Sequence, residues 1–229
     1  MKKFSVTSLM LIAQCSMWPN AYAEEQAAFD VFPRIGVSLN QLAYVRSDGT
    51  KLDANYTALV AGLTFNYNNI YFDAGADLFG VDFLENQGEI TGIERQDYTF
   101  TAGYIPLQDL SVFLGYTVSE MKDDFQGEFQ DDRGYFVGAT YGYLVNGVNL
   151  AGTLAYADLD GNVTVDGSPA DNTKGQTSGF SYGFTISGPF RETMAYTVNI
   201  RIRKYEYEVE GSSAVTDKEI ISTTLGLVF

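Results

Sequence analysis

The chain has 229 residues and is rich in glycine and aromatic residues: 23 Gly, 16 Tyr and 16 Phe stand against only 19% charged residues. The net charge of −15 has the wrong sign for a nucleic-acid-binding protein, because that ligand is itself a polyanion. No apolar run reaches the roughly 18 residues that a helical membrane span needs. The composition favours half-buried strands and tight turns over amphipathic helices, whose solvent face needs Glu and Lys.

The amino-terminal residues 1–23 are predicted to be a cleaved secretory signal peptide. Two lysines follow the first methionine, a mostly apolar stretch comes next, and Ala21 and Ala23 are the small residues of a signal-peptidase site. Cleavage leaves residues 24–229 as one domain and removes Cys15, the only cysteine. The exported chain therefore has no disulfide to stabilise it.

From residue 35 onward, apolar residues alternate with small or polar ones. Residues 59–67 and 70–78 alternate in this way on either side of Asn68-Asn69, and a two-residue Asn-rich turn between alternating segments indicates a β-hairpin. The same pattern recurs in residues 98–104 with 110–116, 135–143 with 148–156, and 180–186 with 196–202, and segments 35–39 and 221–229 complete about ten strands. Eight strands are the alternative if the first or the ninth segment is not a strand.

The two faces of these strands differ in a way that predicts a membrane protein. One face is continuously aliphatic, with Tyr and Phe near the strand ends, and the other carries Gly, Ser, Thr, Asn and Asp. The connections between strands alternate between short and long. An apolar face on the outside of a closed sheet is stable only in lipid. We therefore expect an all-β fold, a closed antiparallel up-and-down transmembrane β-barrel with short periplasmic turns and longer extracellular loops.

The last strand carries the most specific pattern. Apolar or β-branched residues alternate up to a terminal aromatic residue at Ile221, Thr223, Leu225, Leu227 and Phe229. Together with the signal peptide and the alternating connections, this pattern resembles the small bacterial outer-membrane β-barrel proteins (the porin-like or opacity-type superfamily) over residues 30–229. The resemblance implies a Gram-negative outer-membrane location, contact with outer-membrane lipid and lipopolysaccharide, and recognition of the last strand by the barrel assembly machinery. It specifies no subfamily, solute or oligomeric state.

Enzymatic activity is not expected of this chain. The enzymes built on small outer-membrane barrels, such as the omptin proteases, the lipid A acyltransferases and deacylases and the outer-membrane phospholipase, resemble one another in using a catalytic histidine. This sequence contains no histidine. No catalytic residue is assigned, and no cofactor is expected.

Four charged residues are predicted to form a cluster in the lumen. Asp73 and Asp77 share the inward phase of one strand, and Arg201 and Arg203 are inward on a strand four places around the wall. The cluster fits either a charged constriction that selects permeating ions or a salt-bridge network that neutralises buried charge. Because the inward residues are small, we expect a narrow passive pore for ions or small solutes. The alternative is a non-conducting structural or surface-interaction barrel whose acidic loops bind lipopolysaccharide, a host surface or phage.

Two acidic or polar stretches, residues 120–132 and 158–177, are expected to form extracellular loops. They fit either a solvated surface or carboxylates that bridge through divalent cations to lipopolysaccharide phosphates. Asp158, Asp160 and Asn162 have the spacing of calcium ligands, but Val163 occupies a position where a calcium loop needs glycine. The same residues fit an ordinary turn.

Overall fold

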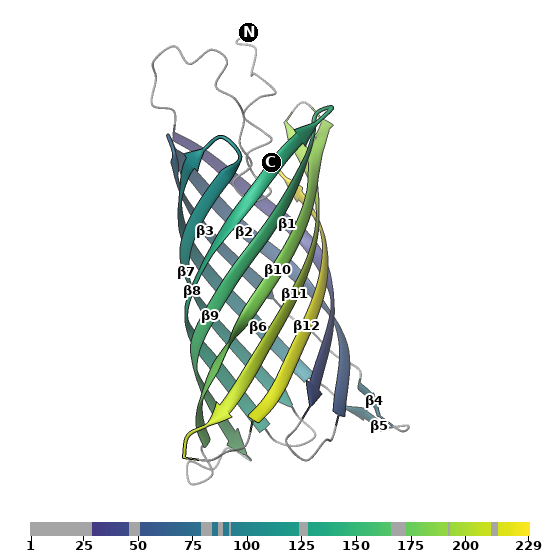
Figure 1. The fold of residues 1–229 in the computed structure, drawn as a ribbon. Helices are drawn as coiled ribbons and strands as arrows, with labels where there is room; N and C mark the ends of the chain where they lie inside the picture. Colours follow the sequence, from purple (N-terminus) through teal and green to yellow (C-terminus); the bar gives the residue numbers. More distant parts are fainter. Residues whose placement is uncertain are drawn as a thin grey trace.

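The computed structural model describes residues 29–45, 51–78, 84–86, 89–91, 93–123, 128–165, 173–191, 193–211 and 215–229. Ten strands form a closed antiparallel barrel in the order β1-β12-β11-β10-β9-β8-β7-β6-β3-β2, in which β2 pairs back to β1 (Figure 1). The strands are β1 (Phe29–Val45), β2 (Lys51–Tyr67), β3 (Ile70–Leu78), β6 (Ile93–Leu107), β7 (Leu110–Asp123), β8 (Glu128–Val145), β9 (Val148–Val165), β10 (Thr173–Arg191), β11 (Met194–Val209) and β12 (Val215–Val228). The ten-strand prediction is confirmed, and the eight-strand alternative is wrong.

Two short strands lie outside the barrel. β4 (Leu84–Asn86) and β5 (Glu89–Thr91) pair with each other and project from the wall near the ends of β2 and β6 (Figure 1). No helix in the described part of the chain is long and apolar enough to cross a bilayer. The predicted signal peptide, residues 1–23, lies outside the described residues.

Tight turns join the strands at one end of the barrel, which also holds the start of β1 and the end of β12 (Figure 1). Asn68 and Asn146 have positive φ angles of 52° and 50°, as hairpin turns that match the strand twist require. β10 continues through Gly188 and Pro189 to Arg191. The register shifts between Pro189 and Arg191, where proline offers no N–H to the ladder. We call this end the turn end and the opposite one the loop end.

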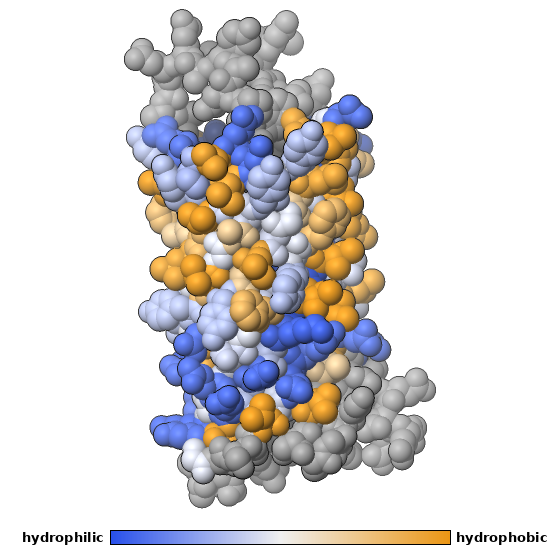
Figure 2. All heavy atoms as spheres, viewed as in Figure 1, coloured by the Kyte–Doolittle hydropathy of each residue, from blue (hydrophilic) through white to orange (hydrophobic). Residues whose placement is uncertain are grey.

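The outer wall of the turn-end half is apolar. Large hydrophobic side chains stand exposed along it, among them Leu39 at 62%, Phe72 at 56% and Leu225 at 63%. On the face of the barrel drawn in Figure 2, hydrophobic residues gather over the middle of the wall, with a hydrophilic band between them and the loop end. Exposed apolar surface on this scale is stable in hydrocarbon and not in water.

In the loop-end half the polarity of the two faces is reversed. Along β1, Leu39 points outward but Leu42, three residues on, points into the bore and is 1% exposed. Ile220 on β12 is likewise inward and fully buried. The outward positions there are polar and exposed: Asp158, Asp160, Lys174, Gln176, Lys204, Glu206 and Glu208. We call this outward polar patch on β9, β10 and β11 the collar. The strands therefore continue beyond the membrane as a water-exposed barrel with its own packed interior.

This extension corrects the two predicted loops. Residues 120–132 and 158–177 are mostly strand, since β7 runs to Asp123, β8 starts at Glu128, β9 runs to Val165 and β10 starts at Thr173. Their composition resembled that of loops because the outward positions of a strand standing in water are polar. Asp132, predicted to lie in an exposed loop, is buried in the bore at 2% exposed.

Candidate functional site: the bore of the barrel

A chamber of roughly 280 Å³ occupies the bore, mainly in its turn-end half. Much of its wall is made of hydroxyl-bearing side chains that include Thr99, Thr117, Thr153, Thr185 and Thr197. The predicted lumen cluster, Asp73, Asp77, Arg201 and Arg203, lines this same chamber. The structure therefore brings all four into one space, but it gives them different partners.

Asp73 is held by an arginine that the sequence reading had not singled out. Arg34 on β1 meets the Asp73 carboxylate in a two-point contact, with Nη2 donating to Oδ2 at 2.8 Å, and Thr64 donates to Oδ1 at 2.6 Å. Both charged side chains are 22% exposed. The guanidinium lies over Gly62, where an added Cβ would come within 2.4 Å of Arg34 Cζ. The glycine on the inward face therefore makes room for the ion pair.

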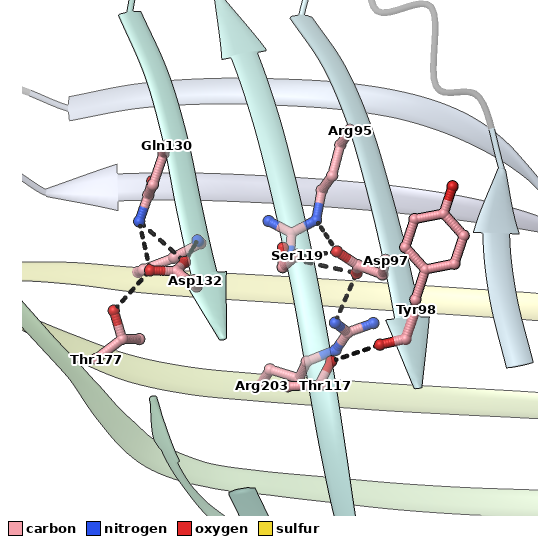
Figure 3. Close-up of polar contacts among 10 residues, drawn as sticks. Arg95, Asp97, Tyr98, Thr117, Ser119, Gln130, Asp132, Thr177 and Arg203 are labelled. Atoms are coloured by element: carbon pink, nitrogen blue, oxygen red, sulfur yellow. Dashed lines mark hydrogen bonds and ion pairs between the residues drawn. The ribbon is translucent and has the colours of Figure 1, made fainter. Parts of the chain in front are cut away.

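Arg203 on β11 reaches across the bore to Asp97 on β6. Its Nη1 donates to Asp97 Oδ2 at 3.0 Å, and the two strands are five places apart in the ten-strand order, on opposite sides of the barrel. Asp97 also accepts from Arg95 Nε at 3.0 Å, and Arg95 Nη2 donates to Ser119 Oγ at 2.8 Å (Figure 3). The side chain of Asp97 is 7% exposed and that of Arg203 is 13% exposed.

A second ion pair crosses the bore nearer the loop end. Lys218 on β12 donates to Asp132 Oδ2 on β8 at 3.0 Å, four places around the wall. Asp132 accepts further bonds from Gln130 Nε2 at 3.0 Å and from Thr177 Oγ1 at 3.0 Å (Figure 3). The Lys218 and Asp132 side chains are 2% and 3% exposed. A carboxylate so far from water is stable because every donor around it is in place.

An apolar cluster forms a third contact across the bore. Leu42, Tyr56, Ala58 and Ile220 pack together from β1, β2 and β12, and Met121 packs against them from β7. β7 and β12 are also five places apart, so the cluster spans the barrel. Among the described residues, two ion pairs and one apolar cluster therefore cross the loop-end half.

Asp77 and Arg201, the other two members of the predicted cluster, are less completely paired. Both line the chamber, and neither makes an ion pair within 4.0 Å among the described residues. They interact electrostatically with each other and with Arg203. The predicted cluster thus divides into two residues fixed in ion pairs, Asp73 and Arg203, and two whose charges face the chamber.

Among the described residues, five that form ion pairs in the bore were missed by the sequence reading: Arg34, Arg95, Asp97, Asp132 and Lys218. The alternation of inward and outward residues along each strand does place these side chains in the bore. Asp97 and Arg95 lie an even number of residues before the inward-facing Gly103 on the same strand, so they face inward as well. Lys218 has the same relation to the inward-facing Gly226. The outward apolar residues that reveal the alternation end before these positions, so the alternation is harder to recognise there.

The remaining predicted residues lie on the strands. Asp158, Asp160 and Asn162 follow one another at alternate positions of β9, outside the bore, and Asp158 accepts a hydrogen bond from Gln176 Nε2 at 2.6 Å. In the described part of the chain, no three His, Cys, Asp or Glu side chains gather as a metal site. The turn predicted for these residues is wrong. Ile221, Thr223, Leu225 and Leu227 alternate along β12, and Phe229 follows it.

The comparisons with known proteins agree on the fold. No family model matches the chain, and no curated protein matches its sequence. The structure is similar to the outer membrane protease OmpT from Escherichia coli, with a TM-score of 0.56 and 14% identity over 90% of this chain and 99% of that one. It is also similar to the translocator domain of the autotransporter NalP from Neisseria meningitidis, with a TM-score of 0.50 and 11% identity over 87% of this chain and 88% of that one. The closed barrel and its apolar outer wall define a protein of the outer-membrane β-barrel class.

Proposed function

We propose that this protein is a closed outer-membrane barrel of a Gram-negative bacterium that acts at the cell surface, and that it is not an open diffusion pore. The observation that carries this proposal is the set of three contacts across the loop-end half of the bore. Passage of a solute would require Arg203 to leave Asp97, Lys218 to leave Asp132 and Met121 to leave the apolar cluster. Separating a buried ion pair is costly, because each charge then lies in a poorly hydrated space without its partner.

The collar supports a role at the surface. It lies just beyond the apolar wall, at the level where lipid headgroups meet water. The collar carries both acidic and basic side chains, and charged residues beside it add ion pairs: Lys204 Nζ of the collar lies 3.1 Å from Glu219 Oε2, and Arg133 contacts Asp131 on the neighbouring strand β8. We propose lipopolysaccharide as the partner of the collar, with lysines and arginines meeting its phosphates directly and carboxylates meeting them through divalent cations. The packed interior behind the collar holds these side chains on rigid strands.

We also propose that the barrel has no hydrolytic activity. OmpT is an outer membrane protease, but the likeness to it shows the fold alone. This chain has no histidine, and three aspartates of the bore, Asp73, Asp97 and Asp132, are each held by a cationic side chain. A carboxylate fixed in this way is a poor general base.

Single-channel recording tests whether the bore is closed. The mature chain, refolded into a planar bilayer in asymmetric salt, should give no discrete current steps. A variant that combines Arg203→Ala, Met121→Ala and Lys218→Ala removes all three contacts across the bore and should conduct. Lys204→Ala, which removes an exposed lysine from the outer face of β11, is the matched control and should stay silent. Folding of each variant is checked by its heat-dependent gel mobility. Current steps with a defined reversal potential in the unmodified protein would contradict the proposal.

A further inference from the structure

The charges that line the chamber are balanced in number. Of the described residues in its wall, three are arginines and three are aspartates: Arg34, Arg201, Arg203, Asp73, Asp77 and Asp97. Arg34 is paired with Asp73, and Arg203 is paired with Asp97. Arg201 and Asp77 are the cation and the anion that remain, and neither makes an ion pair within 4.0 Å with a described residue. The described lining therefore offers one unmatched charge of each sign.

These two charges lie on different sides of the chamber, each beside a charge of its own sign. Arg201 is on β11, two residues before Arg203 and on the same inward face. Asp77 is on β3, four places around the ten-strand wall, and lies opposite Asp97 in the register of β3 with β6. Arg203 and Asp97 are joined to each other across the bore (Figure 3). The chamber is thus left with an unmatched positive charge on its β11 side and an unmatched negative charge on its β3 side.

The neighbours of Arg201 leave its guanidinium open to the chamber. In the strand register, Arg201 lies between Gly183 on β10 and Ser222 on β12, which are two of the smallest residues. Gly183 has no side chain to cover the guanidinium. The Ser222 hydroxyl lines the same chamber and is buried, and it makes no hydrogen bond to the described residues. A polar group of a ligand placed beside Arg201 would therefore meet a second free donor.

We propose that the chamber binds a compact zwitterion, a small α-amino acid, with its carboxylate on Arg201 and its ammonium group on Asp77. A planar guanidinium offers two parallel N–H donors to a carboxylate, and an ammonium group donates to the Asp77 carboxylate. An ion with a single charge would match only one of the two side chains and leave the other without a partner in a poorly hydrated space. A ligand with one charge of each sign matches both.

The space and the route also suit such a ligand. The chamber volume of roughly 280 Å³ admits a small amino acid together with a few waters. The threonine hydroxyls of the wall can donate to its carboxylate or accept from its ammonium group. Entry from the turn end avoids the three contacts that cross the loop-end half. The inference therefore does not depend on whether the bore conducts.

Binding is tested on the refolded mature barrel at neutral pH with L-alanine as the probe. Saturation-transfer NMR of the alanine methyl signal gives an apparent dissociation constant. Propionate is alanine without its ammonium group, and ethylammonium is alanine without its carboxylate, so each keeps the methyl group and one charge. Each should bind about tenfold or more weakly than alanine, because each lacks one charge-assisted contact.

Two substitutions in the chamber should change the preference between the half-ligands in opposite directions. Arg201→Gln and Asp77→Asn should each weaken alanine binding about tenfold or more. The affinity for propionate relative to ethylammonium should fall in Arg201→Gln and rise in Asp77→Asn, because each variant loses the contact to one end of the ligand. Arg133→Gln and Asp158→Asn make the same charge changes outside the bore and should leave the binding of all three compounds unchanged.

A general loss of structure cannot shift this preference both ways. The proposal is overturned if alanine does not bind, if it binds no tighter than propionate and ethylammonium, or if either chamber variant binds it as well as the unmodified protein. An equal loss in either control variant overturns it too. If one chamber variant does not fold, the other decides: weaker alanine binding with the expected change of preference supports the site, and any other result overturns it.

Discussion

Two lysines on neighbouring strands offer a direct comparison between a buried and an exposed ion pair. Lys218 on β12 points inward to Asp132, and both side chains are almost fully buried, at 2% and 3% exposed. Lys204 on β11 points outward to Glu219, and these side chains are 60% and 40% exposed. Lys204 lies directly opposite Glu219 in the register of β11 with β12, and Lys218 lies opposite the adjacent Tyr205. The two lysines therefore lie at nearly the same depth on paired strands, and replacing either one removes one positive charge. They differ in the face of the barrel wall to which they point.

Replacing Lys218 by Met should reduce the free energy of unfolding by about 3 kcal/mol, the lower end of the range for a buried charge deprived of its partner. The lower end applies because Asp132 keeps two donors, Gln130 and Thr177. Lys204→Met should cost about 1 kcal/mol at most, since water screens the exposed pair. Adding Asp132→Asn to Lys218→Met should recover much of the loss, because the orphaned charge is then removed.

Urea unfolding of the barrel in lipid vesicles, followed by tyrosine fluorescence and by gel mobility, measures these differences. The single variants, the double variant and the unmodified protein are compared at one lipid composition. Equal effects of Lys218→Met and Lys204→Met would refute the reasoning, because burial would then not determine the cost. A double variant as unstable as Lys218→Met would refute it as well, because the loss would come from packing and not from charge.

Two further outcomes are expected. Gly103→Ala should destabilise the barrel by about 1–3 kcal/mol, because an added Cβ would come within 2.0 Å of Tyr71 Cζ. Gly152→Ala should change the stability little, because no heavy atom lies within 4 Å of the added Cβ. Equal shifts of the two variants in urea unfolding would contradict this account. Deleting Phe229 should lower the amount of barrel in outer-membrane fractions without changing the stability of protein refolded in detergent, and normal assembly would show that Phe229 is no part of an assembly signal.

The fold was predictable because its main signal is local. Alternation with a period of two, and turns such as Asn146-Gly147, identify each hairpin from a short stretch of sequence. The strand count and the outward face of the turn-end half follow from that alternation. The inward positions of Asp73, Asp77, Arg201 and Arg203 follow from the same phase.

The pairing of these charges was not predictable, because it depends on closure of the barrel. Arg203 and Asp97 are 106 residues apart in sequence, and they meet only when the sheet has closed with one particular stagger. The extent of the strands beyond the membrane was missed for another reason. Residues 158–165 read as a turn because Asp, Gly and Asn favour turns locally, but pairing with β8 and β10 on both sides outweighs that preference.

The reversal of polarity along the strands has a consequence for the lipid around the protein. On β1 the change from an outward to an inward apolar residue takes three positions, from Leu39 to Leu42, and on β9 it takes three, from Tyr156 to Leu159. Moving the barrel along the bilayer normal, with the loop end shifted toward the membrane by one pair of residues or about 5 Å, would draw Asp158 and its neighbours into hydrocarbon. The energy cost is shared by every strand of the collar. Hydrophobic mismatch should therefore be relieved by stretching or thinning of the nearby bilayer, with the protein setting the local thickness and the lipid conforming to it.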